Sequence, residues 1–498
     1  MINAQRKKII AIGSLLVLTL LPSGPALGDT IKDASINSTD LKLVKSNRFK
    51  ASDVGFLIKD LSTGEILTQH NANALFVPAS TTKVFSSAYA LEKLGADARF
   101  NTQLRKTGTV TDGVLKGNLI IVGGGDPFLT ASNLFQMAID LKSQGIKKID
   151  GDFLYDESNL PGQHAIDPAS ELDQGFNPGV SALSVEFNRF FYWRSGRSRG
   201  TAKSQFDPIP QIPSFTLKKS NSNFPPGTDQ TYQVNPGGEE WSFSTKKRYP
   251  RRNELPVRNP GKYTAEFFRF LANKVGIEIP GSKRANNKIE SDLVTQIRSK
   301  SVLELSEAAL EYSNNLFSEL LLLQAAKKEN EEVPDLMSAA QMLQAWVVKS
   351  TESKESSGIV LVNGSGLTAQ NQVSPELMTE FLYRFAQRKY GEKSFWALLS
   401  ISGWKGWIAR RLHDNENSFS VWAKTGSMDY ASSIAGVFFT KRNRPIAFSI
   451  FATDKEKRKK INPPLNSKSL KLKRAAAGWN AKAHVLQDKL LHHWITSY

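Results

Sequence analysis

The chain has 498 residues, a formal net charge of +18 and no cysteine, and 40% of its residues are hydrophobic and 22% charged. This length and composition are those of a globular protein with two or three domains, and they exclude a disordered chain. The absence of cysteine excludes disulfides, a thiol nucleophile and a thiolate metal site. The six histidines show no metal-ligand spacing such as HExxH, so we expect no metal and no cofactor.

Residues 1–28 have the pattern of a cleavable export signal. A basic start at Arg6 to Lys8 precedes an apolar stretch from Ile9 to Leu21 and a small-residue end at Gly28. The apolar stretch is shorter than the roughly 20 residues that cross a bilayer, so we predict cleavage rather than a retained anchor. The mature protein is therefore expected in the periplasm, where nucleic acid is not a partner despite the positive charge.

The first part of the mature chain predicts two strands followed by a helix. VGFLIKDLSTGEILTQH, which starts at Val54, reads as two short strands around a turn at Ser62 to Gly64. The next segment, TTKVFSSAYALEKLGA, has apolar residues at helical spacing, and Gly95 suits the end of a helix. We therefore predict a helix that begins at or near Ser80.

From residue 99 to residue 288 the chain has a different character. It contains the hairpin signals VTDGVL and GNLIIVGGGDP and then a basic stretch, from Ser195 to Lys262, that is rich in proline, glycine and serine. We predict that residues 99–288 are a large, mostly β insertion that forms two small domains. Residues 29–98 and 289–498 would then form one domain together.

The rest of the chain predicts helices and then an antiparallel sheet. Helical patterns occur at YTAEFFRFLANKVG and at VLELSEAALEYSNNLFSELLLLQAAKK. Three apolar runs separated by turn residues, from VWAKTGSMDYASSIAGVFF to PIAFSIFATD, predict an antiparallel meander, and a last helix is expected from about Ala475. The predicted class is α/β of the α+β type, with an antiparallel sheet flanked by helices.

Three short motifs occur in an order that predicts a single site. Ser80 and Lys83 form SxxK, Ser313 and Asn315 form SxN, and residues 424–426 form KTG. Residues three apart on a helix share a face, so Lys83 could take a proton from Ser80. Enzymes that transfer acyl groups to a serine carry these three motifs in this order. The sequence therefore predicts a serine acyl-transfer site.

Two of the motifs also occur elsewhere in the chain. Residues 244–247 read SxxK, but they lie in the basic stretch, where no helical period is present. Residues 106–108 read KTG, but they precede SxN and lead into a hairpin turn at Asp112 and Gly113. We predict that both copies are structural.

With these motifs, and with VNGSGLTAQNQVSP and GGGDP beside them, the chain resembles the low-molecular-mass class C penicillin-binding proteins, which are D-alanyl-D-alanine carboxypeptidases and endopeptidases of the penicillin-binding protein 4 type. The resemblance implies a penicillin-binding/β-lactamase-like catalytic domain with inserted domains between SxxK and SxN. It implies peptidoglycan peptides as substrates and β-lactam antibiotics as covalent inhibitors. Ser427 replaces the threonine usual after KTG, and Asn314 replaces the usual aspartate within SxN.

The resemblance also implies a role for each catalytic residue. Ser80 would attack the carbonyl carbon of the scissile bond and form an acyl-enzyme, with Lys83 as its base. Ser313 would pass a proton to the leaving amine, and Asn315 would hold Lys83 and the substrate amide. Lys424 completes the expected catalytic set.

The expected substrate-binding residues follow one another on the KTG strand. Lys424, with the hydroxyls of Thr425 and Ser427, would bind the terminal carboxylate of the peptide, and Gly426 would allow close approach. The backbone N–H groups of Ser80 and Ser427 are the expected oxyanion hole.

Other interpretations remain open at this point. A β-lactamase or an esterase of the same fold would carry the same motifs, although no ExxLN-like segment of class A β-lactamases occurs between Asn315 and Lys424. A non-catalytic wall-binding protein is a third alternative, which the intact motif residues disfavour. The sequence does not separate carboxypeptidase from endopeptidase activity. The basic run at residues 454–474 reads as a solvated loop or as a site for an anionic wall polymer or membrane surface.

Overall fold

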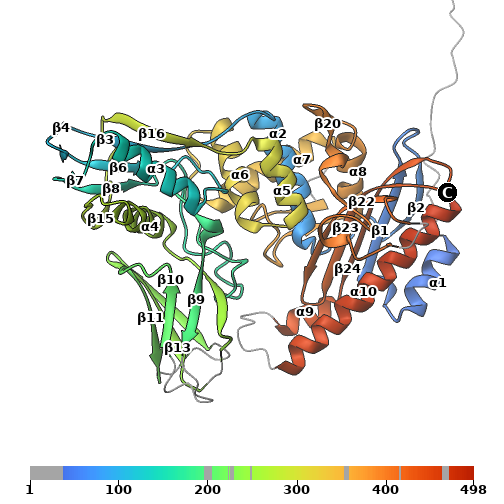
Figure 1. Ribbon diagram of the computed structural model, residues 1–498. Coiled ribbons are helices and arrows are strands. Elements are labelled where there is room, and N and C mark those ends of the chain that lie inside the picture. Colours follow the sequence, from blue (N-terminus) through green and yellow to red (C-terminus); the bar gives the residue numbers. More distant parts are fainter. Residues whose placement is uncertain are drawn as a thin grey trace, which may run out of the picture. The chain divides into compact units, whose positions relative to one another are not determined.

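The computed structural model describes residues 37–195, 205–221, 224, 229–246, 249–352, 358–413, 417–461 and 470–498 (Figure 1). The predicted export signal, residues 1–28, lies outside the described residues, and so does the middle of the basic run, residues 462–469. Among the helices that are described, none combines the length and the apolar character that crossing a membrane requires.

A six-stranded sheet carries the KTG motif. Its strand order is β2-β1-β24-β23-β22-β21, and every neighbouring pair is antiparallel. The strands are β1 (Val54–Asp60), β2 (Ile66–His70), β21 (Ser400–Ile401), β22 (Val421–Met428), β23 (Ala431–Phe439) and β24 (Pro445–Thr453). The predicted first hairpin, the predicted meander and the predicted α+β class are confirmed.

Helices cover both faces of this sheet. On one face, α1 (Ser38–Ser46) and α10 (Leu470–Ser497) share an apolar core with the strands, and they lie side by side in Figure 1. On the other face, α8 (Pro375–Phe385) packs on β1 and β24 and joins a helical core. That core contains α2 (Lys83–Leu94), α5 (Val302–Tyr312), α6 (Asn315–Glu329) and α7 (Leu336–Ser350). The SxxK and SxN motifs therefore lie in the helical layer, next to the sheet.

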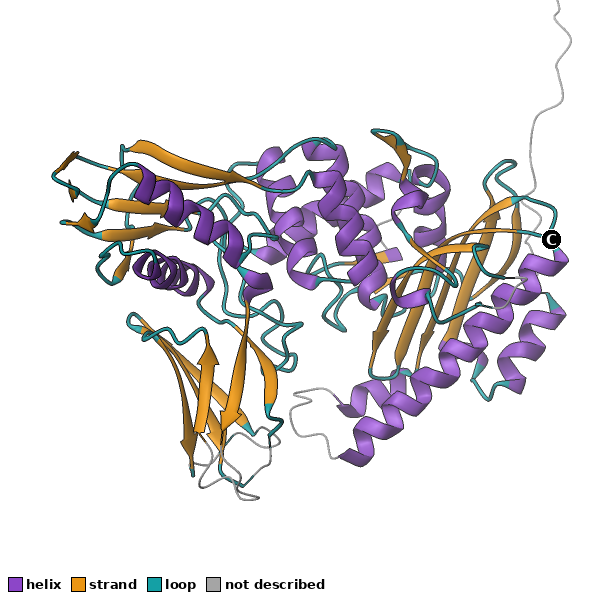
Figure 2. Cartoon of the chain, in the orientation of Figure 1, coloured by secondary structure: helices purple, strands orange, loops and turns teal. Residues whose placement is uncertain are grey.

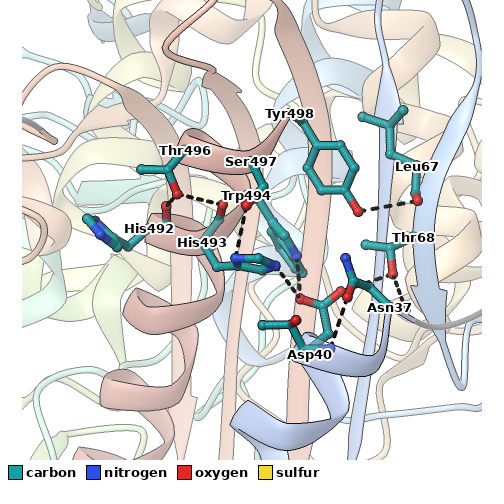
Figure 3. Close-up of polar contacts among 11 residues, drawn as sticks. Asn37, Asp40, Leu67, Thr68, His492, His493, Trp494, Thr496, Ser497 and Tyr498 are labelled. Atoms are coloured by element: carbon teal, nitrogen blue, oxygen red, sulfur yellow. Dashed lines mark hydrogen bonds and ion pairs between the residues drawn. The ribbon is translucent and has the colours of Figure 1, made fainter.

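A buried polar cluster fastens the last helix to the first one (Figure 3). Asp40 of α1 is fully buried and accepts hydrogen bonds from Trp494 Nε1 at 2.9 Å and from Thr68 Oγ1 at 3.0 Å. Tyr498 donates a hydrogen bond from its hydroxyl to Leu67 O at 3.4 Å. Burial raises the pKa of the Asp40 carboxyl. These bonds hold α1, β2 and α10 together.

The chain between α2 and α5 forms sheets and a core of its own. A five-stranded sheet has the order β15-β8-β6-β3-β16 and shares its core with α3 (Ala131–Ser143) and α4 (Pro260–Lys274). Its strands are β3 (Asn101–Lys106), β6 (Leu119–Val122), β8 (Phe153–Asp156), β15 (Ser282–Arg284) and β16 (Asp292–Arg298). The predicted helix at YTAEFFRFLANKVG is α4, whereas α3, which Thr130 caps, is not among the predicted elements. Because β16 lies beyond residue 288, the sheet takes its last strand from after the expected end of the insertion.

Two three-stranded sheets, β10-β9-β14 and β11-β13-β12, complete this region (Figure 2). Their strands are β9 (Arg189–Ser195), β10 (Gln205–Ile209), β11 (Phe215–Ser220), β12 (Gln230–Asn235), β13 (Gly238–Ser244) and β14 (Arg252–Pro256). Phe206 of β10 stacks on Phe243 of β13 with ring centroids 4.4 Å apart, which joins the two sheets.

The remaining described elements are short. They are β4 (Thr109–Thr111), β5 (Val114–Lys116), β7 (Lys148–Ile149), β17 (Ile359–Val360), β18 (Gln372–Val373), β19 (Lys389–Tyr390), β20 (Lys393–Ser394), α9 (Lys455–Ile461) and the 3-10 helices Ala51–Asp53, Glu186–Asn188, Phe395–Leu398 and Gly406–Ile408.

The KTG at residues 106–108, the second copy of the motif, lies in a different sheet from the KTG at residues 424–426. Lys106 ends β3 in the five-stranded sheet, and Thr107 N donates a hydrogen bond to Asn118 O at 2.9 Å. Ser244, from the second copy of SxxK, ends β13, and Lys247 lies outside the described residues. Lys106 is therefore separated from the sheet that carries Lys424.

Candidate active site

The Ser80 hydroxyl lies on a tight turn at the start of a helix. The 3-10 turn Ala79–Thr82 runs directly into α2, and Thr82 Oγ1 donates a hydrogen bond back to Ala79 O at 2.9 Å. Ala79 has a φ of +45°, a left-handed conformation that costs free energy in a residue with a Cβ atom. The turn places Lys83 Nζ 3.0 Å from Ser80 Oγ.

Three oxygen atoms surround the Lys83 amine. Besides Ser80 Oγ, they are Asn315 Oδ1 at 2.7 Å and the backbone oxygen of Ser365 at 2.6 Å. Asn315 Nδ2 donates to Phe176 O at 2.7 Å, and this bond orients the amide with its oxygen toward Lys83. Ser80 and Asn315, from two of the three motifs, thus both contact the Lys83 amine.

This set of contacts suits a neutral amine. A neutral lysine has two N–H groups and one lone pair, and the oxygens of Asn315 and Ser365 can only accept hydrogen bonds. If those two oxygens take the two N–H groups, the lone pair is left for the hydroxyl proton of Ser80. Lys83 is therefore placed to accept a proton from Ser80.

Burial lowers the pKa of Lys83. The largest cause is the loss of hydration at this fully buried position, and the positive charge of Lys424 adds to it. The carboxylate of Glu319 acts in the opposite direction. The pKa of Lys83 stays well below that of an exposed lysine, and this favours the neutral amine.

A buried carboxylate holds the backbone that reaches Lys83. Glu319 of α6 is fully buried and accepts hydrogen bonds from the N–H groups of Gly364 and Ser365, both at 2.8 Å. These two bonds orient the peptide whose oxygen, on Ser365, accepts from Lys83. Burial raises the pKa of Glu319, while these hydrogen bonds and the charge of Lys83 favour its ionised form.

The segment of residues 362–371 packs against the turn that carries Ser80. Asn371 closes this segment, since its Oδ1 accepts from Val362 N at 2.8 Å. Gly366 has a φ of +76°, and a Cβ atom there would overlap the backbone oxygen of Ala79. Only a glycine permits this approach, which brings the Ser365 oxygen to the site.

Ser313 lies on the break between two helices. It has a φ of +56° at the end of α5, and Asn314 then caps α6 by accepting a hydrogen bond from Phe317 N at 3.3 Å. The Ser313 hydroxyl has no hydrogen-bond partner among the described residues, so it does not join the contacts of Lys83 directly.

Strand β22 runs alongside the Ser80 turn. A Cβ atom on Gly426 would lie 2.8 Å from Ser80 N and 2.7 Å from Pro78 O, so only glycine lets the strand come this close. Strand β21 pairs with β22 no further than Ala423. From Lys424 onward, this edge of β22 has no strand partner within the described residues.

The motif residues of β22 differ in how deeply they are buried. Lys424 is buried, and its Nζ donates to the backbone oxygen of Thr425 at 2.8 Å. Burial lowers the pKa of Lys424 to about 7. Thr425 is half-buried and Ser427 is exposed.

A histidine lies beside Ser427 rather than beside Ser80. Ser427 Oγ is 3.4 Å from Nε2 of His484, which projects from α10. Burial, with the charge of Arg411 as a smaller cause, lowers the pKa of His484 to about 4, so the ring is neutral at pH 7. A neutral imidazole has one N–H group, so His484 can donate from Nε2 to Ser427 Oγ and leave the hydroxyl proton of Ser427 for another acceptor.

Three participants in this site are not predicted from the sequence. Glu319 is visible there as one carboxylate in the apolar run NLFSELLLL, which marks it as buried and paired. The Ser365 oxygen is a backbone atom, and His484 lies 57 residues beyond Ser427, so no local pattern identifies either. In the described part of the chain, no group of three or more histidine, aspartate or glutamate side chains could hold a metal ion.

In a comparison with protein families, residues 38–469 match the D-Ala-D-Ala carboxypeptidase 3 (S13) family. Two similar curated proteins are the D-alanyl-D-alanine carboxypeptidase DacB of Haemophilus influenzae and a D-alanyl-D-alanine carboxypeptidase of an Actinomadura species. The Haemophilus influenzae protein is 27% identical, and the match covers 84% of this chain and 88% of that protein. The Actinomadura protein is 24% identical, and the match covers 90% of this chain and 87% of that protein. The crystal structure of penicillin binding protein 4 (dacB) from Haemophilus influenzae has a TM-score of 0.76 at 23% identity and covers 92% of this chain and 99% of that one. This last likeness shows the fold.

Proposed function

This chain belongs to the D-Ala-D-Ala carboxypeptidase 3 (S13) family, and from that premise we propose that its active site is the one built around Ser80. The family makes it a serine peptidase, a hydrolase that acts on D-alanyl-D-alanine bonds. The observation that carries the residue assignment is the position of the buried Lys83 amine, 3.0 Å from Ser80 Oγ, with the oxygens of Asn315 and Ser365 at 2.7 Å and 2.6 Å.

In the proposed first step, Lys83 takes the hydroxyl proton of Ser80 while Ser80 Oγ bonds to the carbonyl carbon of the penultimate D-alanine. The backbone N–H groups of Ser80 and Ser427 stabilise the oxyanion that forms. The C–N bond then breaks, and the proton that Lys83 took from Ser80 passes through the Ser313 hydroxyl to the departing amine, which leaves Lys83 neutral and Ser313 protonated again. Water hydrolyses the acyl-enzyme in the second step and returns Ser80 to its free form.

We propose that the KTG residues bind the end of the substrate. The open edge of β22 allows the peptide to lie along it as an added strand. The Lys424 cation, with the hydroxyls of Thr425 and Ser427, binds the free carboxylate of the last D-alanine. A fixed cation at this position accounts for a preference for peptides with a free C-terminus.

We further propose that β-lactam antibiotics acylate Ser80 and that the enzyme also cleaves D-alanyl cross-links between wall peptides. The comparison structure of penicillin binding protein 4 from Haemophilus influenzae also exists complexed with a β-lactam. A cross-link is an amide of the same D-alanyl carbonyl, so the same nucleophile can attack it.

Location and charge lead to a further part of the proposal. We propose that residues 1–28 direct export to the periplasm. We also propose that the net positive charge of the mature chain, which lacks only Arg6, Lys7 and Lys8 of the basic residues, draws it to acidic wall polymers or to an anionic membrane surface. Binding to isolated cell walls should then weaken as sodium chloride is added, since salt screens exposed charges. Binding that does not change with salt concentration would contradict the proposal that charge draws the protein to the wall or the membrane.

Mass spectrometry of purified muropeptides tests the proposed function. Pentapeptide monomers and cross-linked dimers are each incubated with the mature protein and with the Ser80→Ala variant. Loss of one alanine from monomers indicates a carboxypeptidase, and conversion of dimers to monomers indicates an endopeptidase. Both reactions should disappear in Ser80→Ala. No change of either substrate with the unmodified protein would refute the peptidase assignment.

A further inference from the structure

The four most exposed large apolar side chains of the described residues gather in one place. They are all aromatic, and their exposed fractions are 68% for Tyr312, 67% for Trp404, 69% for Trp407 and 51% for Phe419. Trp407 Nε1 donates to Tyr312 O at 3.3 Å, and the rings of Trp404 and Phe419 are 5.8 Å apart. We call these four residues the aromatic rim. Exposed apolar groups of this size mark a binding surface.

A rigid scaffold holds the two tryptophans outward. Gly403 and Gly406 have φ values of +71° and +70°, and a Cβ atom on Gly406 would overlap Ser400 Oγ. Between the tryptophans, Lys405 forms ion pairs with Glu307 at 3.1 Å and Glu311 at 3.6 Å, both on α5. The loop is thus tied to the strand before it and to the helix beside it, so the tryptophans are presented at little cost in conformational entropy.

The aromatic rim is continuous with the proposed active site. Tyr312 directly precedes Ser313. Trp404 follows β21, which pairs with Ala423, the residue before Lys424. A peptide of four residues spans at most about 14 Å, so a group attached to its N-terminal end can reach a surface that borders the site.

The chemistry of the aromatic rim fits a sugar better than a lipid. The flat, exposed rings offer π faces to the C–H faces of a pyranose, while the indole N–H of Trp404 and the hydroxyl of Tyr312 suit its polar substituents. Lys405 and Lys393 are neutralised by Glu307 and Glu311, whereas binding to an anionic membrane favours unpaired lysines and arginines.

We propose that the aromatic rim binds the N-acetylhexosamine rings of the glycan strand that carries the wall peptide. This inference rests on the proposed peptidase function and extends it, because it names a second part of the substrate. The enzyme would then recognise its peptide as part of the wall polymer rather than as a free peptide.

The test compares two substrates that differ only in the sugar. The double variant Trp404→Ala/Trp407→Ala is assayed on a soluble peptide that ends in D-Ala-D-Ala and on the same peptide attached to a disaccharide. We expect KM for the glycosylated substrate to rise about tenfold, since aromatic stacking is the lost interaction. The kinetics on the free peptide should stay within about twofold. Trp193→Ala, which removes another exposed tryptophan, 44% exposed on β9, is the matched control and should change neither.

Three results would overturn the proposal. Equal loss of activity on both substrates would mean that the tryptophans support the peptide site. Unchanged kinetics together with lost sedimentation on vesicles of anionic phospholipid would assign the aromatic rim to a membrane. A dimer that becomes a monomer in the double variant would assign it to a second copy of the chain.

Calorimetric titration with peptide-free glycan oligomers separates this proposal from the proposed function. Saturable binding that the double variant loses supports the aromatic rim even if no peptide is cleaved. Absence of binding by the unmodified protein, alongside normal cleavage of both substrates, would overturn the aromatic rim and leave the peptidase assignment in place.

Discussion

Glu319 acts on the proposed base in two ways, through the backbone that it holds and through its charge. Replacing it with glutamine keeps the size, but the new amide N–H group must face either Gly364 N or Ser365 N, which are both donors. The Ser365 oxygen should move, and a misplacement of this kind costs up to about 10²-fold in kcat/KM. The lost carboxylate also lowers the pKa of Lys83, because Glu319 holds that pKa up.

A pH profile separates the two effects of Glu319→Gln. Activity should rise with pH as Lys83 loses its proton, and in the variant this rise should begin at lower pH. Glu329→Gln on the same helix, where the carboxylate accepts from Tyr89 and not from the site, is the control and should leave the profile unchanged. A lower rate with an unmoved profile would assign Glu319 a purely structural role.

Lys424 should impose the opposite pH dependence. Its pKa of about 7 in the free enzyme means that the cation, which is the protonated form, is lost as the pH rises through this value. We expect kcat/KM for a peptide with a free carboxylate to fall above about pH 7. In the enzyme–substrate complex the bound carboxylate favours the protonated form of Lys424 and so raises its pKa. We therefore expect kcat to begin to fall at a higher pH than kcat/KM does.

The duplicated motif supplies the control for the Lys424 prediction. Lys106→Ala removes the lysine of the other KTG, which pairs with Asp292 at 3.7 Å in the five-stranded sheet, and should leave kinetics unchanged. Lys424→Ala should raise KM for carboxylate-ended peptides. If Lys106→Ala were as harmful as Lys424→Ala, the assignment of the second copy as structural would be wrong.

At the scale of elements, the contact between β22 and the Ser80 turn sets the distance between the two proposed oxyanion donors. Gly426→Ala places a methyl group against Ser80 N and Pro78 O, so the strand and the turn must separate. Loss of an oxyanion donor costs about 10² to 10³ in rate, and we expect acylation by penicillin to slow by that order. Stopped-flow measurement of acylation, with thermal unfolding as a check on folding, tests this.

Gly478→Ala in α10 is the matched glycine control. Nothing lies within 4 Å of a Cβ atom at this position, so the substitution meets no obstacle. Alanine favours a helix over glycine by up to about 1 kcal/mol, so this variant should be slightly more stable and fully active. Equal acylation rates in Gly426→Ala and in the unmodified protein would show that the close approach is not needed.

Elements of strong local pattern are predictable from this sequence. Two short runs around the turn at Ser62 to Gly64 give β1 and β2, helical spacing gives the helix after Ser80, and the three apolar runs give β22 to β24, all of which the structure confirms. The family predicted from the three motifs is confirmed by the family match. The helix α3 is not predicted, because its segment, TASNLFQMAIDLKS, follows two hairpin signals and lies in the region that is predicted to be mostly β.

The site is only partly predictable because it depends on contacts between distant segments. The order of the motifs identifies Ser80, Lys83 and Asn315, which local chemistry makes recognisable. The segment of residues 362–371 and α10 reach the site only through tertiary packing, so the Ser365 oxygen and His484 have no signal in the sequence. The turn at Ser313 likewise needs the left-handed backbone that only the structure reveals.

At the scale of the whole molecule, the described residues form three apolar cores, and one of them belongs to the inserted region alone. One core contains only residues between 104 and 297, whereas the other two belong to the layers around the six-stranded sheet. The insertion also contributes Leu160, Ile166, Val180 and Ala182 to the core of α2 and α6, so it is docked on that region rather than loosely attached. We propose that residues 99–298 can lose stability without loss of the site as long as they stay folded, because Phe176 O in this region holds the amide of Asn315.

Trp241→Ala tests this division. Trp241 is 1% exposed in β13, and its Nε1 donates to Glu239 Oε1 at 2.6 Å, so truncation leaves a large cavity and a buried carboxylate with one partner fewer. We expect the stability of the insertion to fall by about 3–5 kcal/mol, while Ser80 is still acylated by penicillin at the normal rate below that transition. If the insertion unfolds separately, differential scanning calorimetry should show two unfolding transitions, and in Trp241→Ala only the transition of the insertion should move to lower temperature.

Leu343→Ala in α7, a fully buried position of the helical core, should instead lower the temperature of the other transition, the one that penicillin binding raises. A single transition that both variants lower equally, with acylation lost in each, would mean that the chain unfolds as one cooperative unit.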